Sequence, residues 1–343
     1  MRIFWDETQL GHAPGFFLQR GKVRANFETP DRARALLDGV RALGLAPEPP
    51  PPLDPAALET VHRPDYLAFL RDAWGEWSEL GDAGPEVVAN VHPGPEMLAQ
   101  GGRVGAGLVG RTGWFTADAA CPIGPGTWPA ALAGASCAIA AAEAAGSGGT
   151  AYALVRPPGH HAYAARAGGH CYVNNAALAA ERLRAAGAAR VAVLDIDSHH
   201  GNGTQGIFWQ RPDVLFVSVH GDPAGYYPWY VGHADERGAG EGAGCNLNLP
   251  LPQASGDAAW LAAIETGLAD IRRFAPDALV LSLGFDASEH EPLSYLTVTE
   301  DGFARAGAMI GALGLPAAIV QEGGYNIDLL GRLLQRFLSA YTE

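Results

Sequence analysis

The feature that most constrains the fold of this chain is an alternation of short apolar runs with Ala- and Leu-rich amphipathic segments. Apolar runs without polar alternation, separated by helices, indicate a parallel sheet that is covered on both faces. The strand candidates are Arg2–Trp5, Ala151–Arg156, Arg190–Asp195, Val214–Val219, Ala278–Leu283 and Pro316–Gln321. The helix candidates are Pro129–Ala145, Asn175–Ala186, Ala258–Phe274, Thr299–Leu313 and Ile327–Tyr341. We therefore expect a single α/β domain over residues 1–343, since α/β domains of this size are common.

Two regions interrupt this pattern. Pro47 to Pro55 is proline-rich and is predicted to be a surface loop in polyproline conformation. Residues 83–126 are rich in Gly and Pro and have no clear periodicity. A loop of that length in a compact domain usually carries function, so we expect a lid or an interface there.

The composition excludes some classes of function. A net charge of −14 argues against binding to nucleic acid or to an anionic membrane, because both need a basic surface. The negative charge is compatible with a cationic ligand, although solubility by itself would also account for it. The four cysteines form no CxxC pair, the first ten residues have no signal-peptide core, and residues 129–146 are too weakly apolar to span a bilayer. We expect a cytoplasmic protein without a membrane segment.

Polar side chains gather where several predicted strands end. Asp195 and Asp197 follow one strand, His220 and Asp222 a second, Asp286 a third, and Glu322 to Tyr325 a fourth. Ligands of open parallel sheets bind at the carboxyl ends of the strands. These ends are therefore the predicted functional site.

The segment around Asp197 has the donor types of a catalytic zinc site. Asp197 and His199 are two residues apart, so they project to the same side of an extended strand end. Catalytic zinc needs three protein ligands and an open position, and Asp286 is the candidate for the third ligand. The alternative is a hydrogen-bonded Asp/His cap at a strand end, and Asp286 in isolation would be equally compatible with either.

Two further motifs are suited to acid–base chemistry. His160 and His161 follow two prolines and a glycine, which hold both imidazoles on a stiff turn where they can act as general base and general acid. The same histidines could instead be metal ligands. Tyr325 follows two glycines and could donate its hydroxyl to a developing oxyanion.

Taken together, these motifs resemble the arginase-like deacetylase superfamily, which includes histone deacetylases, bacterial histone-deacetylase-like amidohydrolases and acetylpolyamine amidohydrolases. The resemblance covers essentially the whole chain in order and spacing. Its blocks are RPPGHHA (156–162), GGHCYVNNAA (168–177), DIDSHHGNGTQ (195–205), SVHGDP (218–223), SLGFDA (282–287) and EGGYN (322–326), with weaker matches at 58–70 and 125–128. HHGNGTQ, HGDP and the long insert are most similar to the acetylpolyamine amidohydrolases. The resemblance implies a sheet of about eight strands.

The resemblance also implies a role for each catalytic residue. One Zn²⁺ per chain, or Fe²⁺, would be held by Asp197, His199 and Asp286, and would polarise the amide carbonyl and a water molecule. His161 would be the general base and then the acid, oriented by Asn202. His160, oriented by Asp195, would tune the electrostatics, and Tyr325 would stabilise the oxyanion.

The resemblance further implies a substrate tunnel and a structural cation. The tunnel would be walled by Tyr227, His170 and Leu293, with the Gly169 carbonyl near the substrate amide. Asp195 and Ser218 match the family's structural K⁺ site.

Several positions depart from the family pattern and bear on specificity. His170 stands where an aromatic residue is usual, which makes the tunnel more polar. Many family members have an acidic residue at the rim of the tunnel, but this chain has Ala120 at that position, and Asp118 could substitute for it. Val109 stands where the acetylpolyamine enzymes have a further glutamate. Leu293 is apolar where a polyamine-selective branch has glutamate. We expect Trp114 and Phe115 to form an aromatic wall for a cation or an acyl chain.

The function expected from these residues is hydrolysis of an N-acetyl amide on a primary amine. Acetylpolyamines or similar small acetylated amines lead over acetyl-lysine in proteins, because the insert would narrow the mouth and, in relatives, builds a dimer interface. We therefore expect a homodimer or homotetramer. The sequence lacks the paired-metal signature of an arginase, and a non-catalytic binder of acetylated ligands would be expected to have lost at least one of the catalytic residues.

Overall fold

The central element of the fold is an eight-stranded parallel sheet. The structure is a computed structural model that describes residues 1–343. The strands lie in the order β4-β1-β5-β10-β9-β6-β7-β8, and every neighbouring pair is parallel. Their bounds are β1 (Arg2–Phe4), β4 (Pro47–Glu48), β5 (Thr150–Ala153), β6 (Val191–Asp195), β7 (Val214–Gly221), β8 (Asn246–Leu251), β9 (Ala278–Leu283) and β10 (Ala317–Gln321). The predicted single α/β domain with a parallel sheet is confirmed.

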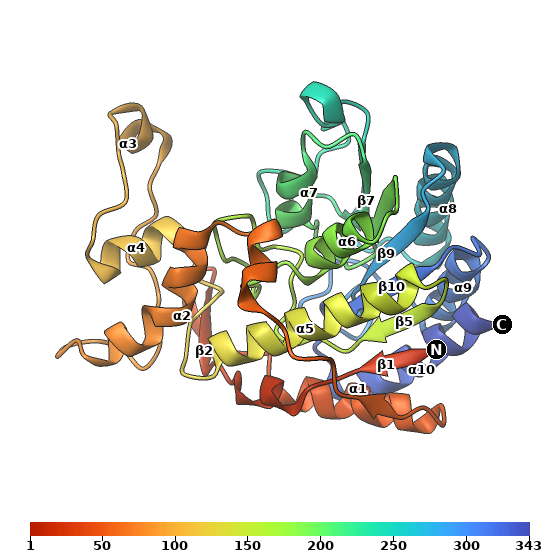
Figure 1. Ribbon diagram of the computed structural model, residues 1–343, viewed down its shortest axis with the longest axis horizontal. Coiled ribbons are helices and arrows are strands. Elements are labelled where there is room, and N and C mark those ends of the chain that lie inside the picture. Colours follow the sequence, from red (N-terminus) through yellow and green to blue (C-terminus); the bar gives the residue numbers. More distant parts are fainter.

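Helices cover both faces of this sheet (Figure 1). One face packs on α5 (Thr127–Gly146) and α6 (Asn175–Ala185). The other face packs on α1 (Pro30–Ala42), α8 (Asp257–Phe274), α9 (Glu300–Gly311) and α10 (Ile327–Thr342). Helix α5 is long and apolar enough to cross a membrane, but 67% of its apolar window is buried in the protein, which is typical of a core helix.

The alternation of side chains along each strand produces two separate cores. In β6, Val191 and Val193 enter the core under α5 and α6, whereas Ala192 and Leu194 enter the core on the opposite face. Because successive side chains point to opposite faces, a strand buried on both sides must be apolar throughout. The continuous apolar runs in the sequence have this origin.

The predicted helices and strands match the structure to within a few residues, but several elements were not predicted. Helices α2 (Pro64–Ser78) and α7 (Asn202–Phe208), the strand β8 and α1 belong to this group. Short 3₁₀ helices cover Glu7–Gly11, Pro55–Thr60 and Gly240–Gly242. The prediction of a polyproline loop from Pro47 was wrong for its first two residues, which form the edge strand β4. Proline is tolerated there because only one side of an edge strand must donate to the ladder.

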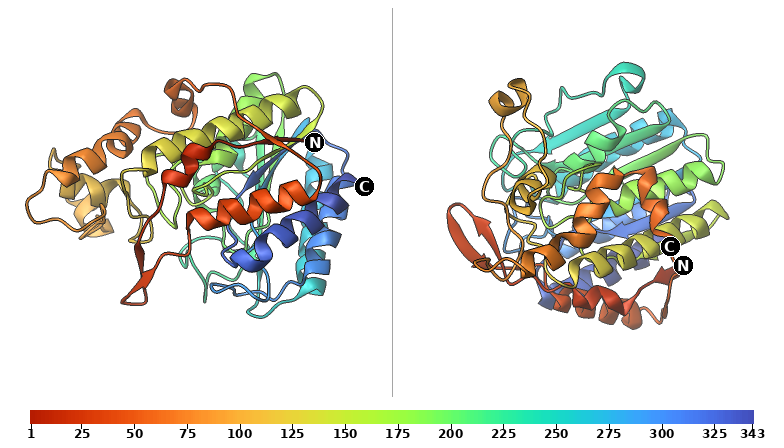
Figure 2. Two further views of the ribbon diagram at one scale, coloured as in Figure 1. Left: turned by 90° about the horizontal axis from the view of Figure 1, so that it is seen from below. Right: turned by 60° about the vertical axis from the view of Figure 1, so that its left-hand side comes forward.

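A hairpin of β2 (Phe16–Gln19) and β3 (Lys22–Ala25) projects from the body of the protein (Figure 2). Its two-residue turn is Arg20-Gly21, and both residues have positive φ, 50° and 72°. Two consecutive left-handed residues match the twist of a tight hairpin, which is why glycine stands at the second position.

The insert at 83–126 is not a featureless loop. It contains the short helices α3 (Pro95–Ala99) and α4 (Leu108–Phe115), and its ends are joined by an antiparallel bridge between Val87 and Ile123. The insert lies beside α2 and projects away from the sheet, with α3 at its tip (Figure 1).

Candidate active site

Three potential metal ligands meet at the carboxyl ends of β6 and β9. Asp197 and His199 follow β6, and Asp286 follows β9. One donor atom from each lies within 4.8 Å of the others, and His199 Nδ1 is 2.8 Å from Asp286 Oδ2 and 3.2 Å from Asp197 Oδ1. Two fully buried carboxylates need a compensating cation, and no Lys or Arg forms an ion pair with either. One nitrogen and two oxygen donors, with His199 open to a cavity, fit a catalytic zinc site.

Glycines allow the backbone to come close to this metal site. A Cβ at Gly284 would collide with the Asp197 carboxylate, and a Cβ at Gly323 would meet the carboxylates of both Asp197 and Asp286. The Gly323 N–H donates to Asp197 Oδ2 at 2.8 Å. Any larger residue at these two positions would therefore displace the metal ligands.

The adjacent histidines lie beside the metal site with separate partners. His160 Nδ1 is 2.9 Å from Asp195 Oδ2, and His161 Nδ1 is 2.6 Å from Asn202 Oδ1. An amide oxygen only accepts, so the proton of neutral His161 is on Nδ1, and Nε2 is left free to accept another. Glu322 fixes the turn, because its Oε2 accepts the N–H groups of Gly159 and His160 at 2.7 and 3.1 Å.

The environments of the two histidines shift their pKa values in opposite directions. Burial lowers the pKa of His160, but the negative charges of Asp195 and Asp197 outweigh it and raise that pKa well above the usual value. Burial, together with the positive charges of His160 and His199, lowers the pKa of His161 well below the usual value. His160 is therefore cationic and His161 neutral, which makes His161 the available base.

Tyr325 faces the same site from the segment after β10. Burial raises the pKa of its phenol well above the usual value, so the hydroxyl remains a donor. The Arg32 guanidinium lies 4.8 Å from the Tyr325 ring centroid and donates to the carbonyls of Glu322 and Gly324 at 2.6 and 2.5 Å. Arg32 thus fixes the backbone on the N-terminal side of the tyrosine.

A cavity of about 540 Å³ opens onto these groups. It brings together nearly all the residues predicted to bind substrate, whereas Asp197 and Asp286 lie fully buried beneath it. The predicted residues that line it are His161, His199, Tyr325, Gly169, His170, Tyr227, Leu293, Asp118 and Ala120. His199 and Tyr325, predicted at separate strand ends, therefore face one pocket, whereas His220 and Asp222, predicted at another strand end, do not line it.

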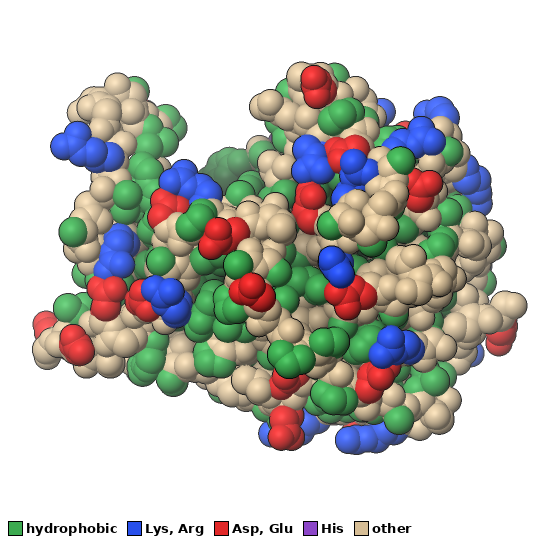
Figure 3. Space-filling view, viewed as in Figure 1, with side chains coloured by type: hydrophobic (Ala, Val, Ile, Leu, Met, Phe, Trp, Pro, Cys, Tyr) green, Lys and Arg blue, Asp and Glu red, His purple; other side chains and the backbone are tan.

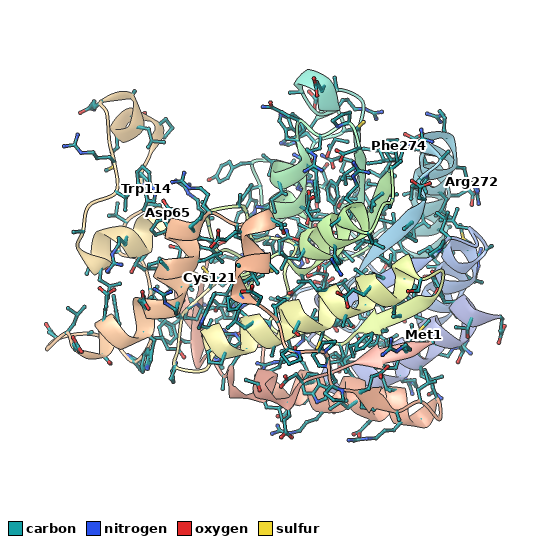
Figure 4. The ribbon with its side chains drawn as sticks, viewed as in Figure 1. Met1, Asp65, Trp114, Cys121, Arg272 and Phe274 are labelled. Carbon is teal, nitrogen blue, oxygen red and sulfur yellow. The ribbon has the colours of Figure 1, made fainter.

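Two predictions about the rim need correction. Phe115 does not line the cavity; it is buried and stacks on Phe69, with ring centroids 5.1 Å apart. Trp114 packs against the same core on the projecting part of the molecule (Figure 4). Phe115 packs on α2 and neither side chain lines the cavity, so the expected aromatic wall is absent at these positions.

Asp118 does line the cavity, but its carboxylate is already engaged. Oδ2 accepts the Tyr227 hydroxyl at 2.6 Å and the Gly169 N–H at 3.1 Å, and Oδ1 accepts the Ala120 N–H at 2.8 Å. Asp118 therefore braces the two tunnel-wall residues and is not a free acid at the rim.

His170 is a buried wall residue with a strained backbone. Its φ is 67°, its exposed fraction is 6%, and neither ring nitrogen forms a hydrogen bond within the protein. Burial lowers its pKa to about 4, so the imidazole is neutral at physiological pH. Its ring lies 6.0 Å from that of Tyr325, which makes it a polar part of the cavity wall.

The residues predicted to hold potassium are also brought together. Asp195 and Ser218 are register partners on β6 and β7, and both are fully buried. The Ser218 hydroxyl is 2.8 Å from His220 Nδ1, and Asp195 Oδ1 accepts the Asp197 N–H at 3.1 Å.

The structure adds residues to the site that were not predicted. Tyr226 stacks on the His199 ring, with centroids 4.4 Å apart, and donates to the Leu293 carbonyl at 2.7 Å. Arg20 and Arg24 line the mouth from the hairpin, and Trp229, which is 51% exposed, lines it from the segment after β7. Two sequence features could have indicated these residues. The Arg20-Gly21 turn marks the hairpin that carries the arginines, and Tyr226 is adjacent to the predicted wall residue Tyr227.

Comparison with known proteins agrees with this geometry. The family model for the histone deacetylase domain matches residues 26–341. The chain belongs to the histone deacetylase family. As a member of that family it is a hydrolytic deacetylase.

Relatives with known names extend over nearly the whole chain. The chain is 46% identical to an acetylpolyamine amidohydrolase of Burkholderia pseudomallei, over 99% of this chain and 98% of that protein. It is 42% identical to acetylpolyamine amidohydrolase 1 of Pseudomonas aeruginosa, with the same coverage. The crystal structure of an acetylpolyamine aminohydrolase from Burkholderia pseudomallei superposes with a TM-score of 0.96 at 45% identity, covering 99% of this chain and 98% of that one.

Proposed function

We propose that this protein is a zinc-dependent amidohydrolase that removes acetyl groups from small acetylated primary amines, with acetylpolyamines as the leading substrates. The observation that carries the proposal is that His161, His199 and Tyr325 face one cavity above the buried pair Asp197 and Asp286. A base, a metal ligand set and an oxyanion donor are the groups that amide hydrolysis requires. The names of the relatives over nearly the full chain support the choice of substrate.

The residues divide the reaction between them. Zinc held by Asp197, His199 and Asp286 would supply Lewis acidity toward the acetamide carbonyl and lower the pKa of a water molecule. His161 Nε2 accepts a proton from the attacking water and returns it to the amine nitrogen as the C–N bond breaks, which yields acetate and the free amine. The Tyr325 hydroxyl donates to the carbonyl oxygen as negative charge develops on it.

The neighbouring groups maintain this protonation pattern. Cationic His160, paired with Asp195, keeps the pKa of His161 low, and Asn202 holds the acceptor nitrogen of His161 toward the cavity. A K⁺ ion bound by Asp195 and Ser218 would offset the buried charge of Asp195 below the site. The same N,O,O ligand set at the catalytic metal would also accept Fe²⁺.

Apart from the cations Arg20 and Arg24, the mouth offers the rest of the substrate mainly aromatic surfaces. The carboxylate of Asp118 is occupied by Tyr227 and Gly169, and no other carboxylate lines the cavity. An ammonium group at the far end of a polyamine would meet the exposed ring of Trp229, where a cation–π contact contributes about 0.5–1 kcal/mol.

Turnover of matched substrates tests the proposal. Zinc-loaded protein is assayed for acetate release from N-acetylputrescine, N-acetylcadaverine and an acetyl-lysine peptide. We expect the two small amines to have the higher kcat/KM. A strong preference for the peptide would reverse the assignment of substrate, and no acetate from any of the three would exclude the activity.

We also propose that the protein is a homodimer whose interface includes the insert. The insert exposes apolar side chains on its projecting part, including Val91 and Met97, which are 59% and 53% exposed, and Leu98. Exposed large apolar side chains on a projecting segment are typical of an interface. Light scattering at micromolar concentration should give twice the mass of one chain, and Met97→Glu should shift it toward the monomer.

A further inference from the structure

Glu291 connects the segment after β9 to the loop that carries Tyr325. It is 8% exposed, its Oε2 accepts the Tyr325 N–H at 2.8 Å, and its Oε1 accepts the Asn326 N–H at 2.9 Å. The Asn326 side chain donates in turn to the His290 carbonyl at 2.8 Å. Three hydrogen bonds therefore hold the two segments together at the position of the catalytic tyrosine.

Tyr325 needs such support because neither its hydroxyl nor the chain before it is fixed by local structure. Its hydroxyl forms no hydrogen bond within the protein, and two glycines precede it, of which Gly324 has a φ of +117°. Glycine loses the most conformational freedom when it is ordered, so the chain must be fixed by contacts from elsewhere. Arg32 holds the carbonyls before Tyr325, and Glu291 holds the N–H groups from Tyr325 onward.

The same carboxylate links the tyrosine to the tunnel wall. Leu293, two residues after Glu291, lines the cavity, and its carbonyl accepts the Tyr226 hydroxyl. Burying a carboxylate is costly unless it is hydrogen-bonded, and here both of its oxygens accept backbone N–H groups of the catalytic loop. Burial raises the pKa of Glu291 to about 7, in keeping with that cost.

We propose that Glu291 is a positioning residue for the reaction: its carboxylate places the Tyr325 hydroxyl where it can donate to the substrate carbonyl. This inference rests on the proposed function. A displacement of about 1 Å at a reacting group can lower the rate about 100-fold, so two backbone hydrogen bonds are enough to matter for catalysis.

Glu291→Gln is the variant that tests the inference. Glutamine has the same shape but one acceptor oxygen, and its NH₂ would face one of the two N–H groups, so one hydrogen bond is lost. We expect kcat to fall roughly 10- to 100-fold with KM within about twofold of wild type. Glu291→Asp, which keeps the charge, should recover part of that loss. The matched control is Glu289→Gln on the same segment, whose side chain is 42% exposed and which should retain wild-type kcat.

A double variant with Tyr325→Phe distinguishes a positioning role of Glu291 from general damage to the fold. In Tyr325→Phe there is no hydroxyl to place, so adding Glu291→Gln should change the residual kcat by less than about twofold. An equal loss in both backgrounds, or no loss in the single variant, would overturn the inference.

A crystal structure of Glu291→Gln gives a readout that is independent of activity. We expect the Tyr325 hydroxyl to be displaced or to have weak density, and an unchanged, well-ordered tyrosine would refute the positioning role. A wild-type enzyme that released no acetate would instead refute the proposed function and leave the crystallographic test of Glu291 decisive.

Discussion

At the scale of single residues, catalysis depends on how neighbours divide charge between two adjacent histidines. His160 is paired with a carboxylate, and His161 with an amide oxygen, although both lie on one rigid turn. The ring centroids are 4.0 Å apart, so a positive charge on one opposes a positive charge on the other. The pair therefore provides one fixed cation and one free base.

Tyr325→Phe should lower kcat far more than it changes KM. The hydroxyl faces the cavity and donates to a charge that develops only in the transition state, so its loss should reduce kcat about 10²- to 10³-fold. Steady-state acetate release and zinc content of both proteins provide the measurement. A variant with full zinc and a kcat within about threefold of wild type would show that another group stabilises the oxyanion.

The sequence predicted the reacting residues and the partners of the two histidines, Asp195 and Asn202, but not the residues that hold Tyr325 and the tunnel wall in place. Asp197, His199 and Asp286 could be selected because each follows an apolar run, and parallel strand ends converge. The bracing role of Asp118 could not be read from the sequence, because its partners Tyr227 and Gly169 are more than 50 residues away. The same is true of Glu291, whose partners follow a different strand.

At the scale of elements, close helix packing is set by paired glycines. Gly39 in α1 lies against the backbone of Gly331 in α10, and a Cβ at Gly39 would collide with the Gly331 carbonyl. These two helices cover the sheet on the side from which Arg32 reaches the tyrosine loop. Their separation therefore affects both stability and the site.

Gly39→Ala should destabilise the protein, whereas Gly75→Ala should not. The first change forces α1 and α10 apart, and overpacking of this kind costs about 1–3 kcal/mol. The second lies on the exposed face of α2 with nothing within 4 Å of the added Cβ, and it should stabilise by about 0.5–1 kcal/mol through helix propensity. Thermal midpoints of the two variants should move in opposite directions, and equal shifts would contradict the packing account.

The strands that the sequence failed to reveal lie at the edges of the sheet or outside it. β8 alternates Asn246 and Asn248 with leucines, a pattern that lacks the continuous apolar run of a central strand. β4 contains a proline, and the β2–β3 hairpin pairs only with itself, outside the sheet. Hydrophobic periodicity finds buried strands, and these are only partly buried or exposed.

At the scale of the whole molecule, the surface is mixed in sign even though the chain is acidic. On the face shown in Figure 3, acidic and basic side chains are interspersed and no broad basic area appears. Many of these charges form exposed ion pairs, such as Arg2 with Glu48, which contribute little to stability. Resistance to acid should instead depend on buried groups.

Stability toward acid should depend on buried neutral histidines such as His62. Its Nε2 accepts the Asn174 N–H at 2.9 Å, and burial lowers its pKa from 6.5 to about 4. Between those values the unfolded chain binds a proton that the folded chain does not, so the free energy of unfolding falls as the pH drops. His62→Gln keeps an acceptor but does not titrate.

The wild-type protein should therefore lose about 2 kcal/mol more than His62→Gln between pH 7.5 and pH 5. Urea unfolding of both proteins at several pH values measures this difference. A constant gap between the two stability curves would show that His62 has the same pKa in the folded and unfolded chains.

The most direct test of metal-dependent deacetylation is acetate release from N-acetylputrescine by protein stripped with a chelator and titrated with Zn²⁺. We predict that activity rises in proportion to added zinc and levels off at about one ion per chain, because Asp197, His199 and Asp286 form a single three-ligand set at the base of the cavity. Asp286→Ala should bind zinc weakly and remain inactive. Full occupancy by one zinc ion without acetate release, or activity that requires two ions per chain, would contradict the assignment.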